Sequence, residues 1–192
     1  MRLGVISIQG NVSEHIDAFR KVFDGEVMRV QNRGDARCCD GLVIPGGEST
    51  TIGKALEMKG MRDEIKKLGE DGTPMMGTCA GLILLSKEVY GGERSDLLGL
   101  LGVTIERNAY GRQRESFEAE ICADSIGKAP FNAVFIRAPL IRGVDNGVKV
   151  LAEYDGRPVA VREKNILGLS FHPELSEDLR FQKLFLEMVE SS

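Results

Sequence analysis

Strand-like runs alternate with helix-like segments through the first half of the chain, and this alternation limits the fold more than any other feature. The strand-like runs occupy residues 3–8, 26–30, 41–44 and 75–77. Between several of them lie amphipathic stretches with a period near 3.6 residues. Strands that alternate with helices build a parallel sheet with helices on both faces. We therefore predict an α/β fold.

The second half of the chain is predicted to be richer in strands. Extended segments lie at 103–106, 117–121, 134–137, 148–154, 158–162 and 166–171. Turn-forming pairs such as Asp155-Gly156 separate several of them, so hairpins or a mixed sheet are expected there. The whole pattern predicts a mostly parallel open sheet with a partly antiparallel extension. With 192 residues and 42% hydrophobic content, the chain 1–192 is expected to form a single domain.

Capping patterns predict a helix near each end of the chain. Asn11 and Glu14 fit the two polar positions of a capping box. The apolar stripe that follows them consists of Val12, Ile16, Phe19 and Phe23. Ser176 could likewise cap a helix, with Glu177 and Asp178 in its first turn. The stripe of that helix consists of Phe181, Leu184, Phe185, Met188 and Val189.

Charge argues against two classes of partner. The net charge is −4 with a sequence pI near 5.4, and basic residues occur in short groups such as Lys66-Lys67. Nucleic acid and anionic membranes attract a basic stripe or patch, which this pattern lacks. The apolar run at residues 3–8 is too short for a signal-peptide core or a membrane span. No nucleic-acid or membrane partner is therefore expected.

Cysteine spacing points to a reducing compartment. The four cysteines are Cys38, Cys39, Cys79 and Cys122. Their spacing contains no C-x-x-C motif and suggests no disulfide framework, so neither a zinc site nor a secreted fold is expected. We expect a cytoplasmic protein, with Cys38, Cys39 and Cys122 as small core or surface residues. In that setting Cys79 stays free to react.

Cys79 lies in the motif Gly77-Thr78-Cys79-Ala80-Gly81, which has the form of a nucleophile elbow with a thiol. A sharp strand-to-helix turn strains the nucleophile, and only glycine leaves room on either side of it. Backbone N–H groups at the start of the following helix would favour the thiolate. The alternative is a buried cysteine in a glycine-rich turn. The motif favours a nucleophile.

His172 and Glu174 follow the strand-like run 166–171 and supply what a thiol nucleophile requires. A base must reach the sulfur, and a third group must orient that base. In an extended stretch, residues two apart face the same side, so Glu174 could hold His172. The alternative is a surface histidine beside a solvated glutamate. His15, the other histidine, is expected to have an exposed or boundary side chain and is the weaker candidate base.

The loop Pro45-Gly46-Gly47-Glu48-Ser49-Thr50-Thr51 ends the run 41–44, at the sheet edge where open α/β folds bind ligands. A backbone N–H of this loop, with that of Ala80, could stabilise an oxyanion. The alternatives are a turn with a Ser or Thr helix cap, or a phosphate loop, whose lysine is missing. Glycine's freedom suggests that one peptide of Gly46-Gly47 is misoriented until a partner docks, so low activity alone is expected.

Six stretches of the sequence resemble the class I glutamine amidotransferases, and more narrowly the glutaminase subunits of pyridoxal phosphate synthases. They are 9–10 (QG), 45–51 (PGGESTT), 77–85 (GTCAGLILL), 107–113 (RNAYGRQ), 135–139 (FIRAP) and 170–175 (SFHPEL). Together they span nearly the whole chain. The stretches 45–51, 77–85 and 107–113 separate the narrower family from glutaminases that serve other synthases.

The resemblance implies roles for particular residues. Cys79 would be the nucleophile, His172 its base and Glu174 the partner of that base. Gly47 and Ala80 would provide the oxyanion donors. The residues implied to hold glutamine are Gly47, Glu48, Ser49, Arg107, Ile136 and Arg137. An arginine suits the α-carboxylate of glutamine because its guanidinium can form paired hydrogen bonds.

The resemblance also implies a reaction and a partner. Attack by the thiolate would form a γ-glutamyl thioester and release ammonia, and water would then free glutamate. Ammonia would pass to a separate barrel-shaped synthase subunit that makes pyridoxal 5'-phosphate, within a large hetero-oligomer. Neither a cofactor nor a metal is implied for this chain.

Three other functions stay open at this stage. A free-standing cysteine hydrolase or peptidase could use the same elbow and base. A glutaminase could serve another synthase, such as one that makes histidine or a nucleotide. A scaffold subunit could retain the site as a relic, although the intact triad argues against this.

Overall fold

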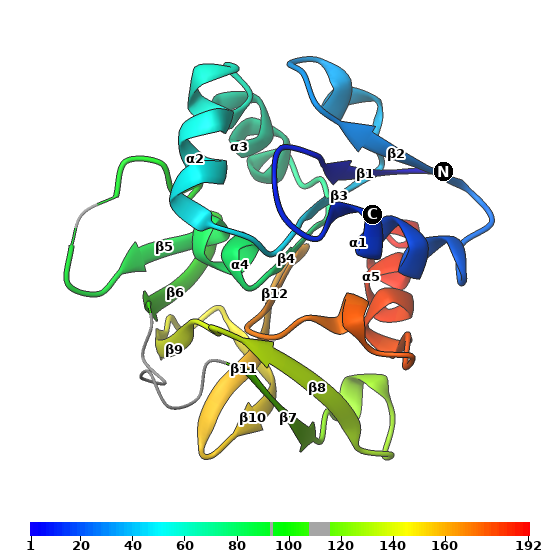
Figure 1. Ribbon diagram of the computed structural model, residues 1–192, viewed down its shortest axis with the longest axis vertical. Coiled ribbons are helices and arrows are strands. Elements are labelled where there is room, and N and C mark those ends of the chain that lie inside the picture. Colours follow the sequence, from blue (N-terminus) through cyan, green and yellow to red (C-terminus); the bar gives the residue numbers. More distant parts are fainter. Residues whose placement is uncertain (93, 108–115) are drawn as a thin grey trace.

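The computed structural model describes residues 1–92, 94–107 and 116–192, and a seven-stranded sheet forms its centre (Figure 1). The strands are β1 (Arg2–Ile6), β2 (Glu26–Val30), β3 (Gly41–Ile44), β4 (Met75–Thr78), β10 (Lys149–Tyr154), β11 (Arg157–Glu163) and β12 (Ile166–Leu169). Their order is β10-β11-β12-β4-β3-β1-β2. The strands from β12 to β2 are parallel, whereas β11 and β10 are antiparallel. The predicted fold class is confirmed.

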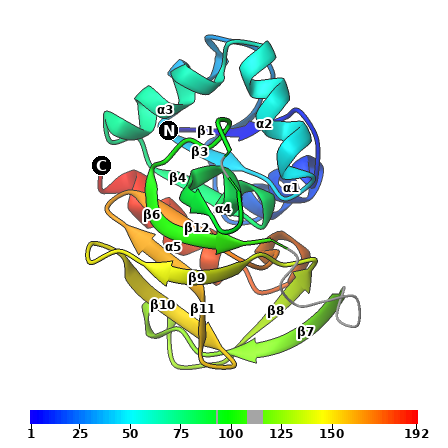
Figure 2. The ribbon, with the colours of Figure 1, turned by 90° about the vertical axis from the view of Figure 1, so that its left-hand side faces the viewer.

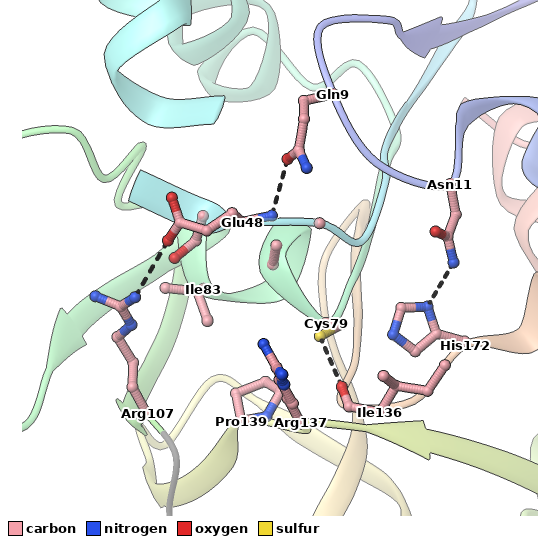
Figure 3. A pocket seen from close by; sticks show the side chains of 13 residues that line it. Gln9, Asn11, Glu48, Cys79, Ile83, Arg107, Ile136, Arg137, Pro139 and His172 are labelled. Carbon is pink, nitrogen blue, oxygen red and sulfur yellow. Dashed lines mark hydrogen bonds and ion pairs between the residues drawn. The ribbon is translucent and has the colours of Figure 1, made fainter. Parts of the chain in front are cut away.

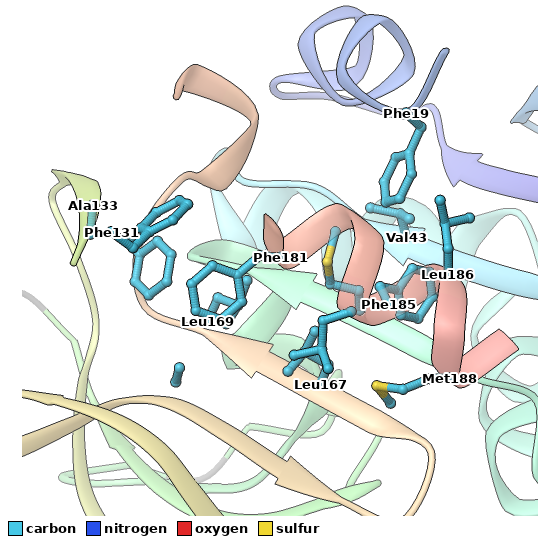
Figure 4. Close-up of a cluster of buried hydrophobic side chains, with 14 of the residues drawn as sticks. Phe19, Val43, Phe131, Ala133, Leu167, Leu169, Phe181, Phe185, Leu186 and Met188 are labelled. Carbon is cyan, nitrogen blue, oxygen red and sulfur yellow. The ribbon is translucent and has the colours of Figure 1, made fainter. Parts of the chain in front are cut away.

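Helices cover both faces of this sheet. The helices are α1 (Val12–Arg20), α2 (Ser49–Met58), α3 (Arg62–Glu70), α4 (Ala80–Leu85) and α5 (Arg180–Glu190). Val43 of β3 packs in the cluster with α1 and α5, whereas its neighbours Leu42 and Ile44 pack in the cluster with α2, α3 and α4. Successive side chains of a strand point to opposite faces, so a strand covered on both sides is apolar throughout. Figure 4 shows Phe181 and Phe185 of α5 among the strand side chains.

Two smaller sheets extend the second half of the chain (Figure 2). One contains β5 (Ser86–Val89), β6 (Leu101–Glu106) and β9 (Leu140–Val144), and the other pairs β7 (Ser116–Ile121) with β8 (Phe131–Ile136). Aromatic contacts join β8 to α5 and to the segment after β12. The rings of Phe135 and Phe171 lie 5.7 Å apart, and those of Phe131 and Phe181 lie 4.9 Å apart. The sequence did not predict β5 or β9, which depend on pairing with β6.

The helix caps differ from the prediction at both ends. Asn11 does precede α1, but its side chain makes no capping hydrogen bond. The last helix begins at Arg180 and not directly after Ser176. The Asp178 carboxylate accepts from the Arg180 backbone N–H, and the Arg180 guanidinium donates to the carbonyls of Ala129 and Pro130. These contacts hold the residues before Arg180 in a turn, so the helix starts late.

Within the described ranges, no helix has both the length and the apolar character needed to cross a bilayer.

Candidate active site

A cavity of about 490 Å³ opens where parallel strands of the central sheet end. Its residues come from the segments after β1, β3, β4, β6, β8 and β12 (Figure 3). β1 lies between β2 and β3, so the chain leaves β1 in one direction along the sheet and later returns to its other side. Ligands of open α/β sheets bind at such a switch point. The predicted location of the loop after β3 is thereby confirmed.

Cys79 occupies a sharp turn between β4 and α4. Its φ is 49° and its ψ is −100°, a conformation that costs a non-glycine residue on the order of 1–3 kcal/mol. A Cβ on Gly81 would lie 2.0 Å from the Ile44 carbonyl oxygen, and one on Gly77 would lie 2.6 Å from the Gly81 carbonyl carbon. The Cys79 backbone N–H donates to the Leu169 carbonyl at 2.8 Å. The elbow geometry and its need for both glycines are confirmed.

The Cys79 side chain faces the end of β8. Its Sγ lies 3.6 Å from the Ile136 carbonyl oxygen, to which the thiol donates (Figure 3). Arg137 follows with a positive φ of 44° and lines the same cavity. The segment that carries His172 is tied to the same strand, because the His172 backbone N–H donates to the Val134 carbonyl at 2.8 Å. β8 therefore brings the nucleophile and the histidine segment together.

His172 and Glu174 form a buried pair. Nδ1 of His172 lies 2.7 Å from Oε1 of Glu174, and both side chains are at most 5% exposed. Burial would lower the pKa of His172, but Cys79 and Glu174 beside it raise that pKa. Burial would raise the pKa of Glu174, yet the neighbouring His15 and His172 lower it. The geometry suits a base with an ionised partner.

The route by which this pair forms differs from the prediction. The stretch Pro173–Leu175 is a 3₁₀ turn and not an extended strand. Asn11 reaches the pair from the start of α1, and its Nδ2 donates to Glu174 Oε1 at 3.1 Å. The same Nδ2 lies 3.3 Å from His172 Nδ1 (Figure 3). The residue expected to cap a helix therefore contacts the catalytic candidates.

His15 is completely buried, so the expectation of an exposed or boundary side chain was wrong. Its Nε2 lies 3.0 Å from Thr78 Oγ1 and 3.4 Å from Glu174 Oε2. Burial lowers the pKa of His15. The sequence signal was present, because His15 stands three residues after Val12 and next to Ile16, on the apolar stripe of α1.

The glycine loop packs directly on the histidine. A Cβ on Gly46 would lie 2.4 Å from Cε1 of His172, and one on Gly10 would lie 1.7 Å from the Gly46 carbonyl oxygen. The Asn11 backbone N–H donates to the same carbonyl at 3.2 Å. These contacts join the segments after β1 and β3 and leave no room for larger residues.

Glu48 caps α2, in place of the serine or threonine cap that the sequence offered as an alternative. Its carboxylate accepts from the Thr51 backbone N–H at 2.7 Å and from the Thr51 hydroxyl at 2.6 Å. The Thr51 side chain is the main cause that lowers the pKa of Glu48 to about 2. Arg107 pairs with Glu48 at 3.5 Å across the mouth of the cavity (Figure 3). The Glu48 backbone N–H donates to Gln9 Oε1 at 2.9 Å.

Ser49 is held from behind by Arg94, a residue that the sequence did not single out. The Arg94 guanidinium donates to the Ser49 hydroxyl at 2.9 Å and to its carbonyl at 3.2 Å. Arg94 also pairs with Asp96, and each of the two side chains is 11% exposed. This buried pair fixes the first turn of α2 beside the cavity.

The cavity collects nearly all of the predicted site residues. Those lining it are Gly47, Glu48, Ser49, Cys79, Ala80, Arg107, Ile136, Arg137 and His172, whereas Glu174 lies behind His172. Gln9, Asn11, Ile83 and Pro139 line it as well. Of the stretch 107–113, residues 108–113 lie outside the described residues. The described part of the chain contains no cluster of three or more His, Cys, Asp or Glu side chains suited to a metal ion.

The fold is that of the class I-like glutamine amidotransferases. A crystal structure of a glutamine amidotransferase superposes with a TM-score of 0.93 at 43% sequence identity, and 98% of each chain is covered. The SNO glutamine amidotransferase family matches residues 5–191, and the chain belongs to that family.

Two relatives share the full length of the chain. A protein of Methanothrix thermoacetophila is 50% identical over 186 residues, which cover 97% of this chain and 98% of the relative. A protein of Archaeoglobus fulgidus is 48% identical over 202 residues, with both chains fully covered. Both are named pyridoxal 5'-phosphate synthase subunit PdxT.

Proposed function

We propose that this chain hydrolyses L-glutamine to L-glutamate and ammonia as the glutaminase subunit of a pyridoxal 5'-phosphate synthase. The observation that carries the proposal is one cavity in which a strained cysteine, a histidine–carboxylate pair and two arginines converge. Membership of the SNO glutamine amidotransferase family and the names of the full-length relatives support the same assignment.

The reaction proceeds through a thioester. Cys79 Sγ attacks the side-chain amide carbon of glutamine while His172 accepts the thiol proton. The same proton passes to the leaving nitrogen, and ammonia departs from a γ-glutamyl thioester. His172 then deprotonates a water molecule that attacks the thioester, and glutamate is released with the free thiol. Glu174 holds His172 in orientation and stabilises its protonated form, because its carboxylate accepts from Nδ1 at 2.7 Å.

Charged groups at the mouth of the cavity select the substrate. Arg107 and Arg137 line it and offer guanidinium groups to the α-carboxylate of glutamine. Glu48 is ionised at neutral pH, since its pKa is lowered to about 2, and can pair with the α-ammonium group. Ser49 and Ile136 complete the contacts with the substrate. A substrate that lacks these zwitterionic groups would lose both ion pairs.

The oxyanion of each tetrahedral intermediate is stabilised by backbone N–H groups of Gly47 and Ala80. Ala80 is the first residue of α4, so its N–H has no partner within the helix. Loss of one such donor typically costs about 3 kcal/mol in barrier. Gly47 belongs to the loop that we expect to adjust when a partner docks.

The partner is a core synthase subunit that uses ammonia to make pyridoxal 5'-phosphate, in the cytoplasm and within a hetero-oligomer. The chain acts as one domain, 1–192, and delivers ammonia without a cofactor of its own. Free-standing hydrolysis of other amides is the rival function.

Glutamate release tests the proposal. The chain is assayed with glutamine, alone and with a core subunit from one of the two organisms named above. We expect activity that rises with the core subunit and is lost in Cys79→Ala, whereas Cys122→Ala, which removes an exposed thiol, keeps it. Absence of glutaminase activity in both settings, with folded protein, would overturn the proposal. Equal turnover of simple amides without the partner would favour the rival hydrolase.

A further inference from the structure

Glu174 has two carboxylate oxygens, and the proposed mechanism uses only one of them. Oε1 accepts from His172 and from Asn11. Oε2 is buried, and among the described residues the polar group next to it is the His15 imidazole, whose Nε2 lies at 3.4 Å. A buried carboxylate oxygen without a donor carries a large desolvation cost. His15 therefore stands where a donor is needed.

The contacts of His15 select its tautomer. Glu174 is an acceptor only, so a bare lone pair on Nε2 would face a negative oxygen at 3.4 Å. A proton on Nε2 can instead be shared between Glu174 Oε2 and Thr78 Oγ1, which lies at 3.0 Å. Nδ1 then keeps a buried lone pair without a polar partner among the described residues. An unpaired acceptor is tolerated better than an unpaired N–H, so this tautomer is favoured over the one with the proton on Nδ1.

The same contacts join three distant segments of the chain. His15 belongs to α1, Thr78 ends β4 directly before Cys79, and Glu174 lies in the turn after β12. All three side chains are buried. The elbow that carries the nucleophile and the carboxylate that orients the base are thus connected through one imidazole.

We propose that His15 is a positioning residue for glutamine hydrolysis: it donates from Nε2 to Glu174 and holds that carboxylate in place on His172. The inference rests on the proposed roles of Cys79, His172 and Glu174. His15 does not line the cavity, and its effect on His172 passes through Glu174. The charged or titratable groups around it are Glu174, His172 and, on its own helix, Glu14.

Nitrogen-15 NMR of the imidazole rings tests the geometry without any enzyme assay. The chain has only two histidines, so both ring systems can be assigned with His15→Gln. We expect a neutral His15 ring at pH 7 with its proton on Nε2. A proton on Nδ1 alone would overturn the proposal, because Nε2 would then have no hydrogen to donate to Glu174. A charged ring would still donate from Nε2 and would leave the donor role in place.

Two substitutions at His15 distinguish the contribution of the Nε2 hydrogen bond from that of side-chain packing. His15→Leu keeps apolar bulk and removes the donor, whereas His15→Gln places an amide N–H near the position of Nε2. A hydrogen bond to a charged group is worth about 1.5–3 kcal/mol, so His15→Leu should lower kcat about 10- to 100-fold with KM changed less than about twofold. We expect His15→Gln to recover most of that loss.

The pH dependence of Cys79 alkylation provides a readout that requires no glutamine. Iodoacetamide labelling is followed on the Cys79 peptide by mass spectrometry, because exposed Cys38 and Cys122 also react. Loss of the donor raises the pKa of Glu174, so the acid limb of the labelling rate should move about one pH unit higher in His15→Leu. Gln182→Leu is the matched control, since it changes another completely buried polar side chain that does not line the cavity.

The outcomes distinguish the inference from the function on which it rests. If native protein with its core subunit fails to hydrolyse glutamine, the proposed function fails, and NMR and alkylation still decide the role of His15. If native protein is active and His15→Leu matches it in kcat and in the acid limb, the positioning role is wrong. Equal loss in His15→Leu and His15→Gln would also overturn it, because the donor would then not matter.

Discussion

The two sides of the cavity are built in opposite ways. The base side, formed by Asn11, His172 and Glu174, is held by a contact of 2.7 Å between side chains at most 5% exposed. The recognition side, formed by Glu48, Arg107 and Arg137, is exposed. Its pair of Arg107 and Glu48 spans 3.5 Å, and these two side chains are 37% and 50% exposed. Removing one partner of a buried pair typically costs 3–5 kcal/mol, whereas an exposed pair contributes about 0–1 kcal/mol.

This difference separates two tasks of the site. The base side must keep one geometry through every proton transfer, so it is buried and tied to several strands. The recognition side must admit a charged substrate and release a charged product, and an exposed pair can exchange its partners at small cost. Substitutions on the two sides should therefore fail in different ways.

The largest effect is expected on the base side. His172→Asn removes the base, and kcat for glutamine should fall by about 10⁴-fold. Glutamate release in the presence of the core subunit measures the loss, and thermal unfolding verifies that the variant is folded. A fall in kcat smaller than tenfold would mean that another group accepts the proton. The base side would then not differ from the recognition side in its effect on kcat.

A buried support beneath the recognition side gives the next effect. Arg94→Met leaves Asp96 buried without its partner, so the free energy of unfolding should fall by about 3 kcal/mol. Urea denaturation measures this change. The double variant Arg94→Met with Asp96→Asn should recover part of the loss. An unchanged urea midpoint in Arg94→Met would show that the pair of Arg94 and Asp96 does not stabilise the start of α2.

Arg107 tests the exposed pair itself. Arg107→Gln should raise KM for glutamine about tenfold and leave kcat within about twofold, since it removes ground-state binding and leaves the base side intact. Steady-state kinetics distinguishes the two parameters. Arg107→Lys is the control, because it keeps the charge without the forked geometry. A fall in kcat at constant KM would place Arg107 with the chemistry instead.

The smallest effect concerns the helix cap and depends on pH. Glu48→Gln should lower stability by about 1 kcal/mol at pH 7, as expected for a lost cap on an exposed group. The pKa of Glu48 is lowered to about 2 from 4.5, so its contribution is present above pH 4.5 and is lost as the pH falls toward 2. Melting temperatures of both proteins at pH 7 and pH 2 measure this. A difference that persists unchanged at pH 2 would contradict the charge-based cap.

Local signals predicted the central strands and the elbow well. The bounds 26–30 and 41–44 match β2 and β3. Each is a short run that contains β-branched residues and is bounded by turn-forming residues, so neighbouring residues suffice to define it. The elbow was predictable from the motif 77–81 itself. The carbonyl that excludes a side chain at Gly81 nevertheless belongs to Ile44, which lies outside the motif.

Long-range contacts account for what the sequence did not reveal. β9 exists because β6 pairs with it. The start of α5 is at Arg180 instead of next to Ser176 because Arg180 donates to carbonyls fifty or more residues away. Asn11 and His15 carry ordinary helix signals, and only the tertiary fold turns them toward Glu174. The base side thus draws on both ends of the chain.

The position of β12 has a consequence for biosynthesis. β12 lies between β11 and β4, although it is the last of the three to be made. At about 5–20 residues per second, a ribosome needs roughly 5 to 20 seconds to proceed from Cys79 to His172. During that interval the edge of β4 is open to unwanted pairing, and the thiol has neither its histidine nor its carboxylate. Under the proposed mechanism, a nascent chain therefore lacks a complete set of catalytic groups until Glu174 has been made, and a product truncated before residue 172 would carry a thiol without its base.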